Sequence, residues 1–332
     1  MKRLTTSAMA LALLANTAAA EGELVIYHWF EYIPAELLEK FTTETGIDVT
    51  MDTYDSNEAM LASLKAGGMG TYDVAVPGDY MVEIMTNEGL LDTIADGELA
   101  NKGNIAAEWA NPAFDPGRTH SIPYQWGSTS FSVNTEDYDG DINTTDILFN
   151  PPKEISGKIN MLDSQGEVLA LASLHMGIPQ CSNDREQLSA LNDMLQEAKT
   201  HWASFNSDTA KEVLVSGDVS VGMIYDGFSA KAREDRASIK YAFPTQGYVV
   251  WMDNVVLLKD APNRDSALAF MDFMLEPENI AAVSNYARYG LGVKGAEEFL
   301  DPELASLPES NPPATAGAGA FIAVCDEATQ AV

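Results

Sequence analysis

Six residues, Tyr27-His28-Trp29-Phe30-Glu31-Tyr32, follow the short apolar run 24–26 and precede Pro34, where an amphipathic helical pattern begins. The apolar run predicts a β-strand, so four aromatic rings and a carboxylate are expected in a strand-to-helix turn. In an open α/β sheet, ligands bind at the carboxyl ends of the strands. The rings could instead belong to the hydrophobic core, and for Tyr27 this alternative is as strong. The residues of this turn that we expect to contact a ligand are Trp29, Glu31 and Tyr32.

The N-terminal part of the chain alternates between strand and helix patterns. Strands are predicted at residues 24–26, 47–53 and 72–76, and helices at 35–44, after the capping residues 55–58, and at 81–88. Gly46 and Gly89 stand where two of these helices would end. A β-α-β-α-β-α order implies a parallel sheet with helices on both of its faces.

Two extended segments separate this unit from a second α/β alternation. Residues 127–134 alternate after a loop-like stretch, 110–124, and residues 248–258 are apolar and β-branched. Between them follow a turn-rich stretch at 137–152, strands at 159–162 and 219–224, and helices at 167–176, at 184–199 and before Gly217; a helical pair comes later, at 264–275 and 277–286. We therefore predict an α/β fold of two lobes joined by two extended crossovers, with a ligand cleft between the lobes. The predicted lobes are residues 21–130 plus 254–300 (lobe 1) and residues 131–253 plus 301–332 (lobe 2).

The N-terminal residues have the pattern of an export signal. Lys2 and Arg3 precede an apolar run at 8–14, and the small residues 18–20 form a cleavage site before Glu21. The apolar run is too short to span a bilayer, and no later run reaches that length without charges. We therefore predict a signal peptide over residues 1–20 and a mature protein in a bacterial periplasm, without insertion into the membrane.

The overall charge restricts the class of partner. The 332-residue chain has a formal net charge of −31. Nucleic acids and anionic membrane surfaces attract basic patches, so neither is expected as a partner. A cationic ligand is compatible with this charge, but an acidic, solvated surface explains most of it equally well.

The two cysteines, Cys181 and Cys325, are expected to form a disulfide, because exported proteins fold in an oxidising compartment. Their spacing fits no metal-binding motif. The alternative is a pair of buried thiols. A disulfide would attach the C-terminal tail to the middle of the chain.

Aromatic residues adjoin carboxylates at the ends of several predicted strands. Besides the first turn, such pairs are Asp79-Tyr80, Tyr225-Asp226 and Trp251 with Asp253. Asp163 and Glu167 lie at another strand-to-helix turn, where Asp163 is better explained as a helix N-cap. Aromatic faces attract ammonium groups and cover methylene chains, while carboxylates fix the charged ends. The pattern favours an organic polycation over a sugar, which would need more amides, and over an anion, which the acids would repel.

Catalytic motifs are absent from the sequence. There is no Gly-x-Ser-x-Gly elbow, no phosphate loop, no His-Glu-x-x-His and no dinucleotide fingerprint. The histidines are scattered, and the 50 acidic residues offer many accidental carboxylate pairs, so an exported hydrolase is kept only as an alternative. We expect a protein that is not an enzyme and that uses no cofactor and no metal.

A series of motifs runs in order along the chain, from residue 24 to about 290. The motifs are Trp29-Phe30-Glu31-Tyr32-Ile33-Pro34, Phe41–Gly46, Tyr54-Asp55-Ser56-Asn57-Glu58, Tyr72–Tyr80, Ser121–Gly127, Phe205-Asn206-Ser207-Asp208, Gly222-Met223-Ile224-Tyr225 and Trp251-Met252-Asp253. They resemble the motifs of bacterial periplasmic spermidine/putrescine-binding proteins. The resemblance implies a type II periplasmic binding-protein fold, a polyamine ligand, and delivery of that ligand to the membrane permease of an ABC importer. We also expect a monomer.

The resemblance implies roles for individual residues. The first turn is similar to the family's first aromatic and acidic cluster, Tyr80 to an aromatic wall, and Glu167 to an acid that holds one amine. Trp251 and Asp253 are similar to the central platform and its carboxylate, and Tyr289 to a further aromatic. The full set of expected ligand-binding residues is Trp29, Glu31, Tyr32, Asp79, Tyr80, Glu167, Tyr225, Asp226, Trp251, Asp253 and Tyr289.

The chain also departs from the family's pattern. Tyr225 stands where relatives place Trp, Asp226 stands where an uncharged residue is usual, and Gly78-Asp79 replaces a Ser-Thr-like pair. The two added acids could serve a longer or more highly charged amine, or they could face solvent. The tail after Pro312 matches nothing in the family, so a ligand contact from it is unassigned. Putrescine or spermidine is the expected ligand; a betaine-type compatible solute or another organic cation is the alternative, and presentation to a sensor is as open as delivery.

Overall fold

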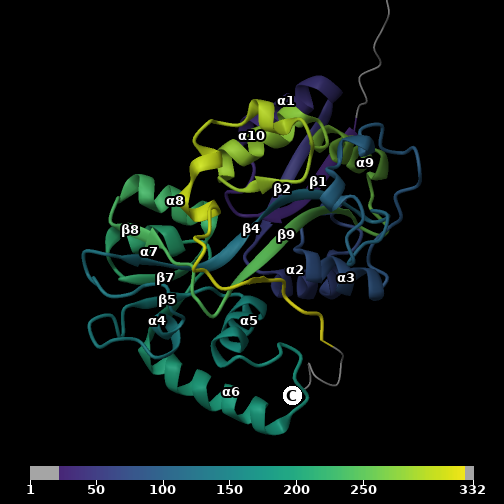
Figure 1. Cartoon of the computed structure of the whole chain (residues 1–332). Helices are drawn as coiled ribbons and strands as arrows, with labels where there is room; N and C mark the ends of the chain where they lie inside the picture. Colours follow the sequence, from purple (N-terminus) through teal and green to yellow (C-terminus); the bar gives the residue numbers. More distant parts are fainter. Residues whose placement is uncertain (1–21, 326–332) are drawn as a thin grey trace, which may run out of the picture.

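The computed structural model describes residues 22–325 and shows a mixed α/β molecule (Figure 1). The predicted signal peptide at 1–20 lies outside the described residues, as do residues 326–332 of predicted lobe 2. Within the described part of the chain, no helix is long and apolar enough to cross a membrane.

The N-terminal unit follows the predicted alternation. It consists of β1 (Gly22–Trp29), α1 (Ala35–Thr45), β2 (Ile47–Tyr54), α2 (Asn57–Ser63) continued by the π-helical turn η1 (Leu64–Gly68), β3 (Val74–Ala75) and α3 (Asp79–Asn87). β1 pairs in parallel with both β2 and β3, which confirms the predicted parallel arrangement. β3 is shorter than the strand predicted at 72–76, because the Asp73 carboxylate, rather than a backbone carbonyl, accepts the hydrogen bond of the Val25 N–H at 2.8 Å.

Two long strands, β4 (Ser121–Asn134) and β9 (Tyr248–Leu257), lie antiparallel and side by side in the middle of the sheet. They are the two extended crossovers predicted from the sequence. The prediction of a loop over 110–124 is wrong at its end, because residues 121–124 belong to β4. Pro123 lies opposite Asn254, and the pairing shifts register between Pro123 and Trp126. This irregularity lets the strand include a residue that has no N–H to donate.

The remaining elements complete one sheet that extends across the whole molecule. Between the crossovers lie α4 (Asp146–Phe149), β5 (Ile159–Met161), α5 (Gln165–Met176), α6 (Arg185–Ala198), β6 (Trp202–Phe205), α7 (Ala210–Ser216), β7 (Val221–Tyr225), α8 (Asp226–Asp235) and β8 (Ile239–Tyr241). After β9 come α9 (Arg264–Met274), α10 (Pro277–Ala287), β10 (Gly290–Leu291) and β11 (Gly319–Ala320). The short 3₁₀ turns are η2 (Lys102–Asn104), η3 (Ala107–Trp109), η4 (Lys199–His201), η5 (Ala296–Phe299), η6 (Leu304–Ser306) and η7 (Pro308–Ser310). The main strand order is β2-β1-β3-β9-β4-β7-β5-β6, while β8 and β10 pair with β4 and β11 pairs with β9.

Three local interpretations need correction. The stretch 137–152, read as turns, contains the one-turn helix α4, and α8 was not predicted at all. The assignment of Asp163 as an N-cap is wrong, because the chain stays extended through Ser164, so that α5 begins at Gln165 and Asp163 is exposed.

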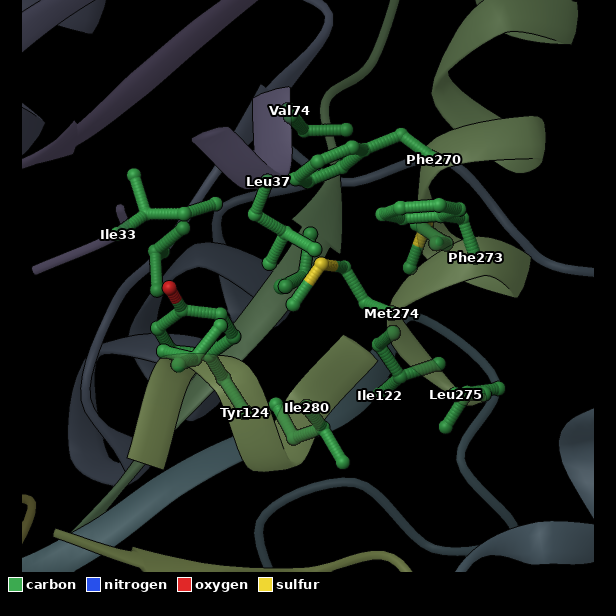
Figure 2. Packing of buried hydrophobic residues seen from close by; sticks show 14 of the residues in the cluster. Ile33, Leu37, Val74, Ile122, Tyr124, Phe270, Phe273, Met274, Leu275 and Ile280 are labelled. Carbon is green, nitrogen blue, oxygen red and sulfur yellow. The ribbon is translucent and has the colours of Figure 1, made fainter. Parts of the chain in front are cut away.

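Buried apolar side chains gather in separate clusters on the two sides of the crossovers. One cluster joins α1 to α9 and α10, where Leu37 packs among Phe270, Phe273 and Met274 (Figure 2). A second cluster joins β5 and β7 to the helices α4, α5 and α7. From these clusters we infer the division expected from the sequence, with lobe 1 as residues 22–130 plus 254–300 and lobe 2 as residues 131–253 plus 301–325.

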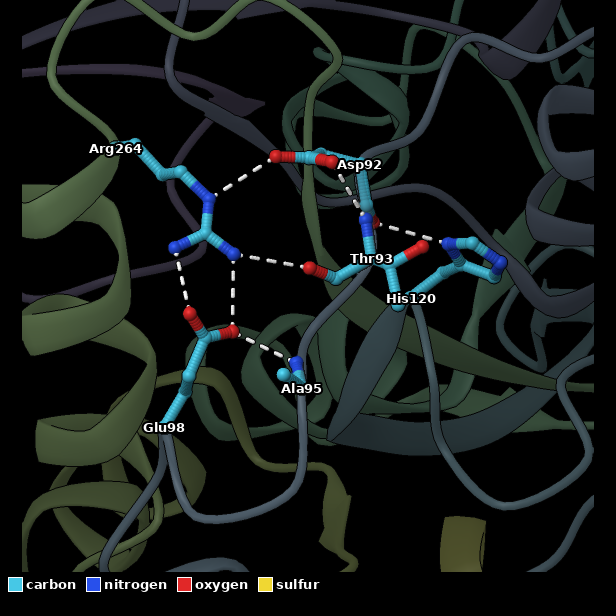
Figure 3. Close-up of polar contacts among 6 residues, drawn as sticks. All are labelled: Asp92, Thr93, Ala95, Glu98, His120 and Arg264. Atoms are coloured by element: carbon cyan, nitrogen blue, oxygen red, sulfur yellow. Dashed lines mark hydrogen bonds and ion pairs between the residues drawn. The ribbon is translucent and has the colours of Figure 1, made fainter.

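A polar network centred on Arg264 ties the start of α9 to the loop before β4 (Figure 3). Its guanidinium donates to Asp92 at 3.0 Å and to both oxygens of Glu98 at 2.8 and 2.9 Å. It also donates to the Thr93 carbonyl, while the His120 ring lies 2.9 Å from the Asp92 carbonyl. Exposed ion pairs each stabilise a fold only weakly, but this network fixes several loop residues at once. It therefore holds residues 92–98 of this loop against the start of α9.

Candidate ligand-binding site

A cavity lies between the lobes, beside the middle of β9. Its aromatic lining is Trp29, Phe30, Tyr32, Tyr80, Tyr225, Phe228, Trp251 and Tyr289. Its acidic lining is Asp55, Glu167, Asp208 and Asp253, and its remaining lining is Asn57, Gly78, Ser164, Ser207 and Ile322. Among the described residues, this lining includes no lysine, arginine or histidine. We call this space the ligand cavity.

Two carboxylates of the ligand cavity are almost completely buried. Glu167, in the first turn of α5 of lobe 2, is 6% exposed, and Asp253, on β9, is 8% exposed. The Glu167 carboxylate accepts hydrogen bonds from the Thr129 hydroxyl at 2.6 Å and from the Tyr225 hydroxyl at 3.1 Å. No ion pair within residues 22–325 involves either acid. Each is therefore buried without a positive charge beside it.

Burial sets the protonation of these two acids. It raises the pKa of Glu167 to about 7, although the hydrogen bonds from Thr129 and Tyr225 lower it. Burial also raises the pKa of Asp253 well above its ordinary value, and the charges of Asp79 and Glu167 raise it further. A cation placed between the two acids would favour their ionised forms, because it supplies the counter-charge that the protein lacks.

The rings around these acids are fixed by their own contacts. Trp251 packs edge-on against Tyr225 and Tyr289, with ring centroids 6.0 and 5.1 Å apart. Its indole N–H donates to the Thr129 hydroxyl at 3.0 Å, the same hydroxyl that donates to Glu167. On the other lobe, the Trp29 indole donates to the Val76 carbonyl at 2.7 Å. The aromatic walls are thus held in place before any ligand binds, which reduces the entropy cost of binding.

Most of the residues predicted from the sequence line this cavity. The structure brings together Trp29, Tyr32, Tyr80, Glu167, Tyr225, Trp251, Asp253 and Tyr289. Glu31 does not line it: this residue has a left-handed backbone (φ 49°) and is exposed. Its negative charge instead acts to raise the pKa values of Lys211 and Lys231, which belong to lobe 2.

Asp79 and Asp226 do not line the ligand cavity either, and neither of them faces solvent. Asp79, at the start of α3, accepts hydrogen bonds from the backbone N–H groups of Tyr80 at 2.6 Å and Met252 at 2.9 Å. Asp226, at the start of α8, accepts from the Gly227 N–H at 3.0 Å. Burial raises the pKa of Asp79 to about 7 and that of Asp226 to about 8. Asp79 therefore attaches the start of α3 to the crossover β9, and Asp226 stabilises the start of α8.

Several lining residues were missing from the prediction. They are Phe30, Asp55, Asn57, Gly78, Ser164, Ser207, Asp208, Phe228 and Ile322. Asp55 and Asn57 belong to the motif at 54–58, and Ser207 and Asp208 to the motif at 205–208, so the family motifs contained a signal for them. Asp208 stands at the exposed rim of the cavity, and partial desolvation of its carboxyl and the charge of Asp55 on the opposite lobe raise its pKa. Ile322 lies in the tail, where the sequence offered no signal.

The C-terminal tail, defined here as residues 313–325, passes beside β9 (Figure 1), and its Ile322 lines the ligand cavity. β11 pairs in parallel with β9, and Ile322 then contacts the apolar clusters of both lobes. A disulfide joins Cys325 of the tail to Cys181, the pair expected from the sequence. The tail is therefore attached to lobe 2 by a covalent bond and by a short strand pairing.

The fold and the cavity are those of a solute-binding protein of bacterial transport systems. The chain matches the family described as bacterial extracellular solute-binding protein over residues 36–313, and it belongs to this family. It is 34% identical to a spermidine/putrescine-binding periplasmic protein of Escherichia coli over 304 residues, which cover 91% of this chain and 87% of the relative. It is 31% identical to a putrescine/cadaverine-binding protein of Pseudomonas aeruginosa, with 95% and 92% covered.

A solved structure supports the same assignment. The spermidine/putrescine ABC transporter substrate-binding protein of Streptococcus pneumoniae superimposes with a TM-score of 0.74 at 33% identity, covering 93% of this chain and 95% of that one. These similarities confirm the resemblance seen in the sequence motifs and the periplasmic binding-protein fold predicted from it.

Proposed function

We propose that this protein is a periplasmic solute-binding protein that captures a polyamine, putrescine or spermidine, and delivers it to the membrane permease of an ABC importer. It acts by ion pairing and ring stacking, as a monomer, and catalyses no reaction. The predicted signal peptide at 1–20 and the periplasmic relatives support export. The relatives named for spermidine, putrescine or cadaverine support this class of ligand.

The observation that carries the proposal is the pair of buried, uncompensated acids in an aromatic cavity. Ionised carboxylates are costly to bury unless a positive charge accompanies them. Glu167 and Asp253 lie on different elements, α5 and β9, so they suit a ligand with an ammonium group at each end. The rings of Trp251, Tyr225 and Tyr289 can cover the methylene chain between the two ends.

The same features disfavour a betaine-type compatible solute. Such a ligand has one positive charge and a carboxylate of its own, which Asp55, Asp208 and the two buried acids would repel. Residues from both lobes and from the crossover β9 line the cavity, so a bound polyamine stabilises the closed arrangement of the lobes. A closed, loaded form is what a permease can distinguish from the empty protein.

A thermal-shift screen tests the ligand class. Putrescine, cadaverine, spermidine and glycine betaine are added separately to the mature protein, because a ligand that binds only the native state raises the melting temperature. We expect the amines to raise Tm in a concentration-dependent way and betaine to leave it unchanged. A shift with betaine and none with the amines would refute the proposal.

A further inference from the structure

The side chain of Ile322 lies between the ligand cavity and a second hollow. The second hollow is lined by Asp79, Tyr80, Glu83, Glu108, Trp109, Pro112, Ala113, Phe114, Phe321, Ile322, Ala323 and Val324. Tyr80 and Ile322 line both spaces. Tyr80 is buried on α3, whereas Ile322 is part of the tail. The partition between the two spaces is therefore formed by one residue of lobe 1 and one residue of the tail.

The tail is held rigidly at this point. The Gln180 side-chain amide donates to the Phe321 carbonyl at 2.9 Å and accepts from the Ala323 N–H at 2.9 Å. These two hydrogen bonds flank Ile322 on both sides, in the manner of a neighbouring strand. The disulfide to Cys325 fixes the chain a few residues further on. The position of the Ile322 side chain is therefore determined by lobe 2, although the side chain also packs against the core of lobe 1.

The partition stands close to the buried acids. A β-carbon placed on Gly166, the residue before Glu167, would lie 3.7 Å from the Ile322 side chain and 3.4 Å from the Tyr80 hydroxyl. The same point lies 3.3 Å from Glu58, whose other carboxylate oxygen is buried and has no hydrogen-bond partner in the described structure. One end of the ligand cavity is thus closed by Ile322 and Tyr80, beside two carboxylates.

The second hollow, like the ligand cavity, combines acidic and aromatic side chains. It contains the acids Glu83 and Glu108 and the rings of Trp109 and Phe114, and within the described residues its lining has no basic side chain. It is also the larger space, about 420 Å³ against about 70 Å³ for the ligand cavity. An alkyl chain that extended past Ile322 would find both apolar cover and carboxylates for a further ammonium group.

We propose that Ile322 limits the length of the polyamine that the protein accepts. This inference rests on the proposed function, and it makes a tail residue a determinant of specificity for that site. In the native protein the Ile322 side chain blocks the path from Glu167 to the second hollow, so a longer amine must fold back or leave an ammonium unpaired. Removal of this side chain joins the two spaces and allows a longer amine to extend into the second hollow.

The test is a calorimetric comparison of spermidine with spermine, which is longer by one aminopropyl unit, on the full mature protein and on Ile322→Ala. Val324→Ala is the matched control, because Val324 is an aliphatic tail residue that lines the second hollow but not the ligand cavity. We expect the ratio of the spermine Kd to the spermidine Kd to fall by about tenfold in Ile322→Ala, through added methylene burial and one further ion pair. The ratio should be unchanged in Val324→Ala.

An unchanged ratio in Ile322→Ala, when the native protein binds spermidine, would overturn the inference while leaving the proposed function intact. If both affinities fell by the same factor, Ile322 would only hold the lobes together. If the native protein bound no polyamine, the proposed function would fail, and this inference would fail with it.

Discussion

Polyamine binding should release protons, because burial raises the pKa of Glu167. Burial raises this pKa to about 7, so only about a tenth of the Glu167 side chains are ionised at pH 6 and about nine tenths at pH 8. An ammonium group needs the ionised form and lowers the pKa once it is bound. The affinity should therefore weaken as the pH falls through 7, by about tenfold between pH 8 and pH 6 from Glu167 alone. The pKa of Asp253 is also raised, so its protonation makes the affinity fall more steeply as the pH falls.

The assay is isothermal titration of spermidine at pH 6, 7 and 8 in two buffers with different ionisation enthalpies, which counts the protons released. In Glu167→Gln the affinity at pH 8 should be lower than in the native protein, because one counter-charge is lost. The ratio of the affinity at pH 8 to the affinity at pH 6 should be about tenfold smaller in this variant than in the native protein, because the titrating group is gone. An affinity that is constant from pH 6 to 8, with no proton release, would refute the assignment of Glu167 as a buried ligand-binding acid.

Three further outcomes are expected. The pKa values of Asp79 and Asp226 in the folded protein are about 7 and about 8, above those in the unfolded chain. The stability that these acids contribute is therefore present at low pH and is lost as the pH rises through the folded-state pKa values. Urea unfolding of the empty protein should therefore show lower stability at pH 9 than at pH 5, and Asp79→Asn should reduce that difference; an unchanged difference contradicts the account of Asp79. Trp251→Ala should weaken spermidine binding by roughly tenfold to a hundredfold by calorimetry, through loss of the ring platform, whereas unaltered binding would remove Trp251 from the site. Replacement of Cys181 and Cys325 by serine should lower the free energy of unfolding by roughly 2 to 4 kcal/mol in urea titration, and a variant as stable as the native protein would show that the tail needs no covalent anchor.

The overall fold was predictable because its information is local. Strand and helix patterns alternate over short distances, and each β-α-β unit permits essentially one arrangement of its strands. The helix α8 escaped prediction because Gly227 weakens its pattern. A β-carbon at that position would lie 2.5 Å from the Tyr289 ring, so the glycine serves a tertiary contact that is distant in sequence. Local propensity cannot reveal such a requirement.

The site was predictable only in part, for a similar reason. Acids and rings at strand ends lie near the cleft. Which groups surround each of them depends on chain segments that are distant in sequence. Asp79 was expected to bind ligand or face solvent, yet the N–H of Met252 on β9 holds it in the interior. Glu31 adjoins two lining residues in sequence, yet its left-handed backbone places it outside the lining. Ile322 depends on the disulfide and on Gln180, which no pattern in the tail could disclose.

Asp253→Asn tests most directly whether the buried carboxylates bind the ammonium groups of a polyamine. The variant keeps the size and shape of the side chain and removes only its charge. Asp193→Asn is the control, because it makes the same change in net charge at an exposed position on α6. Calorimetric titration with spermidine at pH 8 should show a loss of at least about a hundredfold in affinity for Asp253→Asn, and none for Asp193→Asn. Equal and tight binding of spermidine by Asp253→Asn and the native protein would contradict the account.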